Sequence, residues 1–365
     1  MHAGEGIVSG RLAREPLRVK SNLVDDKGDV MVGNSALIRR PAGPEDYGPL
    51  ALHEQARGAG KWEPFLYSGP AGSRRYFVYT PAGYTLETRV PMVVMLHGCT
   101  QTPADSAAGT RWNPLADQRT FIVVYPEQTS EDNPLSCWDW FLPEHQVRGS
   151  GEAGVIGGIT KQVIAEDTRW NVDPGRVYVA GMSAGAAMAV LLGATYPDLY
   201  TAIAVHSGLE YQAATDVSAA QPAMTNGGPD SVRQGQAAFD AMKGHARPVP
   251  IIVFHGLVDG VVNPTNGDQV VRQWMETNRL ASNNAYQPDF AQPTKVDDCQ
   301  VPDGHAYTMS TWSDSQGKVV QEYWRIAYMN HAWSGGSVLG SFTDPRGPDA
   351  TQTIWAFFDH HRRMA

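Results

Sequence analysis

The residues best suited to chemistry lie near the middle of the chain, inside a Gly-x-Ser-x-Gly pattern. Residues 181–185 read GMSAG, and they separate a β-branched, strand-like run at 176–180 from an alanine-rich, helix-like run at 184–196. A sharp turn between a strand and a helix lifts a serine hydroxyl above the edge of a sheet, and small flanking residues let the backbone bend there. We therefore predict that Ser183 is the nucleophile of an acyl-transfer reaction. A serine that caps the following helix is compatible with this role.

An acid and a base suited to this serine follow it in the chain. Asp259 lies on a loop after an apolar strand-like run, where we expect its carboxylate to orient an imidazole; an Asx turn is the alternative. His331 follows the last strand-like run, which is the place of the base in the order Ser, Asp, His. An imidazole titrates near neutrality, so it can take a proton from Ser183 and return it to a leaving alcohol. His255, on the same loop as Asp259, is assigned a structural hydrogen bond.

An attacked ester carbonyl becomes an oxyanion, which needs two preorganised N–H donors. We expect one of them to be the backbone N–H of Ala184, directly after the nucleophile. The other is expected from the loop at 97–101, which follows the apolar run 92–96. We choose the amide of Cys99 for this second donor, with the amide of Thr100 as the alternative.

These side chains need a scaffold that brings distant segments to one edge of a sheet. Short apolar runs predict strands at 76–79, 92–96, 121–125, 176–180, 202–205, 251–254 and 322–327. Helix-like runs lie at 155–170, 184–196, 234–242, 267–279 and 350–361. Apolar strands that alternate with helices predict an α/β fold with a mainly parallel central sheet and helices on both faces. Functional sites in such sheets form beyond the carboxyl ends of strands, where Ser183, Asp259 and the turn at 97–98 are expected.

The 365 residues show no internal repeat and no low-complexity linker, which favours one catalytic domain. We place this domain at 61–365. Residues 1–60 have little periodicity and are interpreted as an N-terminal extension, partly irregular. The proline-rich stretch 283–304 is expected to be an insertion before the last strand, bordering the mouth of the site.

Composition argues against several kinds of partner. The formal net charge is −9 and no basic run resembles a phosphate-binding stripe, so nucleic acid is not an expected partner. No apolar run is long enough to cross a membrane, and residues 1–20 lack the apolar core of a secretory signal. The three cysteines lack the paired spacing of a zinc site and allow at most one intramolecular disulfide.

Five motifs together resemble those of the poly(3-hydroxybutyrate) depolymerase-like esterases, over roughly residues 60–361. They are LHGCTQ at 96–101, CWDW at 137–140, GMSAG at 181–185, HAWSGG at 331–336 and TDPRGP at 343–348. The resemblance implies an α/β-hydrolase fold with the triad Ser183, Asp259 and His331. It also implies that the chemistry needs no metal and no organic cofactor.

The same resemblance implies a disulfide between Cys99 and Cys137, which would tie the oxyanion loop to the loop that carries Trp138. Cys299 has no counterpart in the family and is expected to be a free thiol. A disulfide needs an oxidising compartment, so a secreted or periplasmic protein is expected, with a cytoplasmic one as the alternative because no leader is present.

The substrate is less defined by the residues than the reaction is. Trp138, Trp140 and Trp333 lie in sequence beside the site loops, where indole faces could hold an acyl chain or a phenolic ring; packing in the core is the alternative. The chain ends soon after the final helix, without a linker or an adsorption domain. That ending argues against attack on crystalline polymer.

Together the residues and the resemblance predict a serine carboxylic-ester hydrolase that works through an acyl-enzyme. Short hydroxyalkanoate esters or an amorphous polyester such as poly(3-hydroxybutyrate) are the expected substrates. The alternative is a feruloyl or acetyl esterase acting on plant polysaccharide. A serine peptidase is less expected because no propeller-like repeat precedes the catalytic part, and a non-catalytic binding protein is disfavoured by the intact triad.

Overall fold

A computed structural model describes residues 30–32, 36–38 and 58–363 of the chain. The chain divides into two units, residues 1–40 and 41–365. In the first unit, the described residues form a two-stranded antiparallel sheet of β1 (Val30–Val32) and β2 (Ala36–Ile38). The expected N-terminal extension at 1–60 therefore lies mostly outside the described residues.

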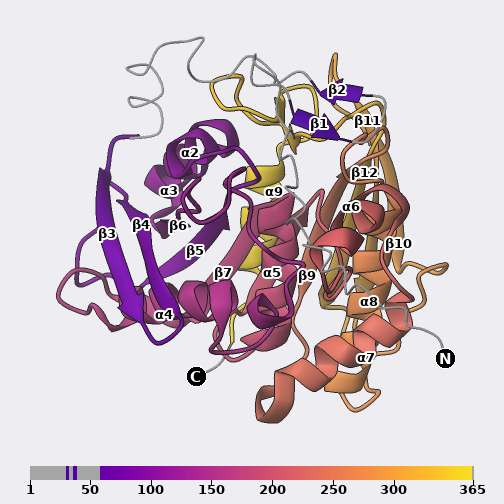
Figure 1. Cartoon of the computed structure of the whole chain (residues 1–365), viewed down its shortest axis with the longest axis horizontal. Helices are drawn as coiled ribbons and strands as arrows, with labels where there is room; N and C mark the ends of the chain where they lie inside the picture. The colour runs from indigo at the N-terminus through magenta and orange to yellow at the C-terminus, as the bar shows by residue number, and fades with distance from the viewer. Residues whose placement is uncertain (1–29, 33–35, 39–57, 364–365) are drawn as a thin grey trace, which may run out of the picture. The chain divides into compact units, whose positions relative to one another are not determined.

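The second unit is built on a ten-stranded sheet, in the order β10-β11-β12-β9-β8-β7-β5-β6-β4-β3 (Figure 1). Its strands are β3 (Lys61–Gly69), β4 (Gly72–Thr80), β5 (Val90–Leu96), β6 (Ile122–Pro126), β7 (Val172–Met182), β8 (Ala202–His206), β9 (Ile251–Gly256), β10 (Lys295–Gln300), β11 (Ala306–Ser313) and β12 (Val319–Ile326). The central strands β6, β5, β7, β8, β9 and β12 pair in parallel, and an antiparallel pair extends the sheet at each end. The predicted mainly parallel sheet is confirmed.

Helices cover both faces of this sheet. They are α2 (Pro103–Thr110), α3 (Trp112–Arg119), α4 (Gly151–Ala165), α5 (Ala184–Thr195), α6 (Val217–Asn226), α7 (Ser231–Met242), α8 (Thr265–Ala281) and α9 (Ala350–Asp359). One buried apolar cluster joins one face of the sheet to α4, α5, α7 and α8, and a second joins the other face to α2, α3 and α9. Strands buried on both faces must be apolar at nearly every position, and β5, β6, β8 and β9 are buried throughout.

The last helix closes the sheet face beneath β7. The Phe358 ring stacks on Tyr178 with centroids 4.5 Å apart, and the Tyr178 hydroxyl donates to the carbonyl of His361 at 2.6 Å. The N–H of Arg363 donates to the carbonyl of Gly175 at 2.9 Å. Helix α9 and the residues after it thus brace the strand that leads into the predicted nucleophile.

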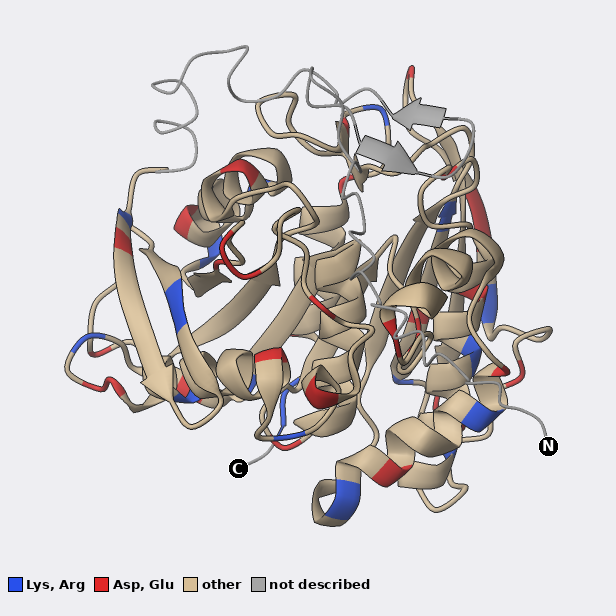
Figure 2. Ribbon diagram, viewed as in Figure 1, with Lys and Arg blue, Asp and Glu red and all other residues tan. Residues whose placement is uncertain are grey.

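Neither edge strand, β3 or β10, contains an apolar run of the kind that predicts a strand. β10 lies inside the stretch predicted to be an insertion, and five of its six residues are exposed, so it offers no apolar run. β3 alternates exposed and half-buried positions for the same reason. Charges at these edges discourage pairing with another chain, and Figure 2 shows Lys, Arg, Asp and Glu interspersed over the described elements. Within the described residues, no helix has both the length and the apolar character needed to cross a bilayer.

Candidate active site

The predicted nucleophile sits at a strained turn between β7 and α5. Ser183 has φ 57° and ψ −122°, a conformation that few non-glycine residues adopt. A Cβ on Gly181 would lie 2.1 Å from the carbonyl oxygen of Gly185, and a Cβ on Gly185 would lie 2.3 Å from the carbonyl oxygen of Leu96. Only glycine therefore fits on either side of the serine, which is the steric reason for the GxSxG pattern. The Ser183 N–H donates to the carbonyl of His206 at 3.0 Å.

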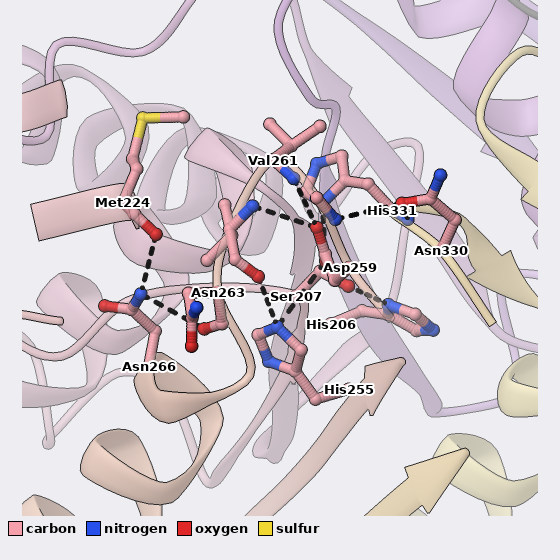
Figure 3. Close-up of polar contacts among 12 residues, drawn as sticks. His206, Ser207, Met224, His255, Asp259, Val261, Asn263, Asn266, Asn330 and His331 are labelled. Atoms are coloured by element: carbon pink, nitrogen blue, oxygen red, sulfur yellow. Dashed lines mark hydrogen bonds and ion pairs between the residues drawn. The ribbon is translucent and has the colours of Figure 1, made fainter. Parts of the chain in front are cut away.

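Asp259 and His331 form a buried hydrogen-bonded pair (Figure 3). The Nδ1 of His331 lies 2.8 Å from Oδ2 of Asp259. The other carboxylate oxygen, Oδ1, accepts the backbone N–H groups of Val261 and Val262, both at 2.9 Å. The two residues come from loops that follow the parallel neighbours β9 and β12, so their positions at one sheet edge follow from the strand order.

These contacts fix the protonation of the pair. Burial alone would raise the pKa of Asp259, but the charges and hydrogen bonds of His331 and His255 outweigh burial and hold that pKa well below its usual range. An ionised carboxylate can only accept, so His331 carries its proton on Nδ1 and leaves Nε2 free as a base. His255 lies with Nε2 2.8 Å from the carbonyl of Val262 and 3.5 Å from Asp259, in agreement with its predicted structural hydrogen bond.

The remaining contact of a working triad joins the Ser183 hydroxyl to His331. Over residues 58–363, the hydroxyl makes no hydrogen bond to another described residue. Hydrogen bonds of this kind are often long until a substrate is bound. We therefore treat the complete relay as part of the proposal below.

The two amides predicted for the oxyanion are both free. Neither the N–H of Cys99 nor that of Ala184 has a hydrogen-bond partner within the described part of the chain. The N–H of Thr100, the alternative donor, is already bonded to the carbonyl of Leu135 at 2.7 Å. The geometry thus favours Cys99 over Thr100.

The loop that carries Cys99 lies directly against the nucleophile. A Cβ on Gly98 would be 3.4 Å from the Cβ of Ser183, so the two backbones approach as closely as side chains permit. The Gly98 N–H donates to Oε1 of Gln101 at 2.8 Å, which closes the loop on itself.

A disulfide joins Cys99 to Cys137, as the family resemblance implied. The next residue, Trp138, donates its Nε1–H to the carbonyl of His97 at 3.0 Å. The two loops are therefore joined by a covalent bond and a hydrogen bond, which limits the movement of the Cys99 amide. Cys299 is free and exposed, as expected.

His97 fixes the same loop from its other side. Its Nε2 accepts the backbone N–H of Gln128 at 3.0 Å, so the proton is on Nδ1, which donates to the carbonyl of Gly98 at 2.8 Å. Burial lowers the pKa of His97 to about 4, so the ring is neutral at physiological pH. A neutral ring is the only form that can make both hydrogen bonds.

The three tryptophans near the site loops lie in the core. Their exposed fractions are 0% for Trp138, 6% for Trp140 and 1% for Trp333. The Nε1–H of Trp333 donates to the hydroxyl of Thr351 at 3.0 Å. These positions fit the packing alternative, and the substrate contact expected of the three residues stays a prediction.

Asp139, His145 and Glu152 form a group of metal-ligand type, with ligand atoms within 4.8 Å of one another. The Glu152 carboxylate is already engaged: Oε1 accepts from Gln128 at 2.6 Å and Oε2 accepts the N–H of Asp139 at 2.7 Å. His145 lies 3.3 Å from the same carboxylate. We interpret the group as a structural link between the Trp138 loop and α4, and nothing in the sequence spacing had indicated it.

The chain is similar to several known proteins. The family described as Esterase PHB depolymerase matches residues 74–296. The chain is 37% identical to poly(3-hydroxyalkanoate) depolymerase C of Paucimonas lemoignei over 205 residues, which cover 56% of this chain and 48% of that protein. It is 31% identical to feruloyl esterase B of Neurospora crassa over 214 residues, 57% of this chain and 70% of that protein.

A solved structure shares the fold. Acetyl xylan esterase from Aspergillus awamori superposes with a TM-score of 0.65 at 19% identity, covering 82% of this chain and 99% of that one. The α/β-hydrolase fold implied by the resemblance is confirmed. The chain spans about half the length of the depolymerase that it matches, with 48% of that protein covered.

Proposed function

The chain belongs to the Esterase PHB depolymerase family, and from that membership we propose that it is a serine carboxylic-ester hydrolase with Ser183, Asp259 and His331 as its triad. The observation that carries this proposal is the 2.8 Å hydrogen bond between His331 and Asp259, at the sheet edge where the GxSxG turn also lies. It leaves an unprotonated Nε2 available to a serine.

In the proposed mechanism, Nε2 of His331 takes the proton of the Ser183 hydroxyl as its oxygen attacks the ester carbonyl. The ionised Asp259 stabilises the imidazolium that forms. The N–H groups of Cys99 and Ala184 hold the oxyanion of the tetrahedral intermediate. His331 then gives its proton to the departing alcohol, and a water molecule repeats the sequence on the acyl-enzyme.

The proposed substrates are short hydroxyalkanoate esters and amorphous polyester such as poly(3-hydroxybutyrate). The identity of 37% to a poly(3-hydroxyalkanoate) depolymerase supports this choice. Feruloyl or acetyl esters of plant polysaccharide are the second candidate, supported by the identity of 31% to a feruloyl esterase. Clearing of a poly(3-hydroxybutyrate) suspension, compared with ferulate release from methyl ferulate, separates the two candidates.

We also propose that the protein folds in an oxidising compartment. The Cys99–Cys137 disulfide supports this, because such bonds persist outside the reducing cytosol. Thiol labelling of the protein isolated from its native cells, without reductant, is expected to modify Cys299 alone. Modification of all three cysteines would contradict the proposal.

Replacing Ser183 by alanine tests the reaction itself. S183A removes one hydroxyl from a preformed turn, so we expect the fold to persist while turnover of p-nitrophenyl esters falls by roughly 10⁴-fold to 10⁶-fold. Circular dichroism and thermal unfolding check the fold, and initial rates check turnover. S315A, at an exposed serine in the turn between β11 and β12, is the control and should keep its activity. Retained activity in S183A would refute the assigned nucleophile.

A further inference from the structure

One buried histidine contacts both the nucleophile turn and the loop of the base. His206 ends β8 and has an exposed fraction of 0%. Its carbonyl accepts the N–H of Ser183 at 3.0 Å, and its ring Nε2 accepts the N–H of Ser334 at 3.0 Å. Ser334 lies three positions after His331 in the chain, so a single residue holds the backbone on either side of the proposed proton transfer.

The contacts of the His206 ring define its tautomer and its orientation. A backbone N–H can only donate, so Nε2 is unprotonated and the proton is on Nδ1, 3.2 Å from the hydroxyl of Ser207 (Figure 3). The ring stacks against Phe254 with centroids 5.6 Å apart and against Trp333 with centroids 5.0 Å apart. The ring is therefore held in place by two aromatic neighbours and two hydrogen bonds.

We propose that His206 is a positioning residue, which sets the distance between the Ser183 turn and the segment that carries His331. This inference rests on the proposed function. Ser334 is also anchored through its hydroxyl, which donates to the carbonyl of Pro348 at 2.7 Å, and the neighbouring Trp333 through its Nε1–H, which donates to Thr351. Without the acceptor on His206, the Ser334 backbone loses its hydrogen bond to the end of β8. The same end of β8 accepts the backbone N–H of Ser183.

The charge of His206 suits this role. Burial, and then the neighbouring His255 and His331, lower the pKa of His206 well below its usual range. The ring thus stays neutral while His331 becomes an imidazolium in the reaction. A cationic ring at this position would lose its bond to Ser334 and would oppose the charge that forms on the base.

Three substitutions of His206 test the proposal. H206F keeps an aromatic ring between Phe254 and Trp333 but offers Ser334 no acceptor. H206Q places a side-chain oxygen near the position of Nε2, whereas the shorter H206N reaches only the position of Nδ1. We expect kcat per titrated site to fall by roughly 10²-fold in H206F and H206N, with little change in KM. A loss of this size is what misplacing a catalytic group by about 1 Å costs. H206Q should recover at least part of this loss.

The measurement is steady-state hydrolysis of p-nitrophenyl acetate, normalised by active-site titration with a phosphonate. H361F is the matched control, since His361 is also buried, with its ring nitrogens 2.7 Å and 2.8 Å from the carbonyls of Phe357 and Val319, but lies after α9, at the opposite end of β7. H361F should lower stability and keep kcat. Equal kcat in H206Q and H206N, or unchanged kcat in both, would overturn the positioning role even if stability fell. Absence of ester turnover in the unaltered protein would overturn the proposed function instead.

Discussion

The proposed nucleophile shows how a single residue can hold a strained conformation. A non-glycine residue at φ 57° and ψ −122° costs of order 1–3 kcal/mol, so Ser183 keeps this conformation only because its surroundings leave no other. Gly181 and Gly185 remove the side chains that would clash, and the carbonyl of His206 holds the Ser183 N–H. The strain therefore serves to present the hydroxyl at the edge of the sheet.

The two oxygens of Asp259 have different partners, which predicts the effect of D259N. Oδ1 accepts the N–H groups of Val261 and Val262, so the amide oxygen of an asparagine will take that position. Its NH₂ group then faces Nδ1 of His331 and favours the tautomer that is protonated on Nε2, which cannot act as a base. We expect kcat to fall by roughly 10⁴-fold with the fold intact, measured by initial rates on p-nitrophenyl esters.

A matched change elsewhere is D216N. Asp216 caps α6, with Oδ1 accepting the N–H of Ala219 at 2.9 Å, and asparagine caps helices equally well. This variant should keep its activity. A D259N enzyme as active as D216N would show that Asp259 does not orient the base.

At the residue scale, the sequence predicts what depends on order and on strand ends. Ser183, Asp259 and His331 are predicted because each follows a strand in the order that a hydrolase needs. The burial of Trp138 and Trp333 could not be predicted, because an indole beside a site loop has the same sequence pattern whether it faces solvent or the core. His206 also ends a strand, which was a usable signal, but its role depends on contacts with Ser334, 128 positions away.

At the scale of elements, the loop at 97–101 is held by a disulfide, by the Trp138 hydrogen bond and by the two hydrogen bonds of the His97 ring, and the disulfide can be tested separately. The bond closes a loop with a sequence separation of 38, for which chain entropy predicts a contribution of about 2–4 kcal/mol to stability. C137S leaves the Cys99 amide in place but frees its loop. We expect the free energy of unfolding in urea to fall by about that amount.

The same variant should also lose catalytic power. Removal of an oxyanion donor costs roughly 10²-fold to 10³-fold, and a loosened donor should cost less, roughly tenfold in kcat. C299S is the control, because Cys299 is free and exposed, and it should change neither quantity. If C137S lost stability but kept the kcat of C299S, the disulfide would be structural only.

Strands were predictable where burial on both faces of the sheet requires a run of apolar residues. The central strands β5 to β9 were found because parallel strands covered on both faces have few polar positions. The edge strands β3 and β10 were missed because solvent on one side permits polar residues. Helix α6 was missed as well; it contains Pro222 and buries only two of its ten residues, so it shows little helical periodicity.

For the whole molecule, a buried carboxyl group predicts how stability depends on pH. Glu210 has an exposed fraction of 2%, and neither side-chain oxygen makes a hydrogen bond of ordinary geometry within the described residues, although the nearby Ser231 side chain favours the ionised form. Burial raises the pKa of Glu210 from 4.5 to about 8. The unfolded chain therefore releases this proton first. The contribution of Glu210 to stability is complete below pH 4.5 and is lost as the pH rises toward 8.

E210Q keeps a neutral side chain of the same shape at every pH. We expect it to remove a slope of up to about 1.4 kcal/mol per pH unit from the free energy of unfolding between pH 5 and pH 8. Urea unfolding at pH 5, 6, 7 and 8 measures the slope in both proteins. E131Q, at an exposed glutamate, is the control for loss of one charge. Parallel curves for the unaltered protein and E210Q would mean that Glu210 is ionised in the folded state.

The fold class of the whole molecule was predicted, but the order of the strands in the sheet was not. Alternating apolar strands and helices fix a parallel sheet covered on both faces, yet they do not determine that β7 lies between β5 and β8 or that antiparallel pairs extend both ends. The strand order depends on packing between segments far apart in the chain. The prediction of a catalytic domain at 61–365 remains a prediction.

The contacts between the last helix and β7 have a practical consequence for digestion and for engineering. Arg363 is bonded to Gly175 at the beginning of the strand whose other end presents Ser183. A carboxypeptidase removes only residues that it can draw away from the body of a protein, so we expect digestion from the C-terminus to stop at Arg363. A purification tag or fusion partner joined through a flexible spacer should leave this contact undisturbed.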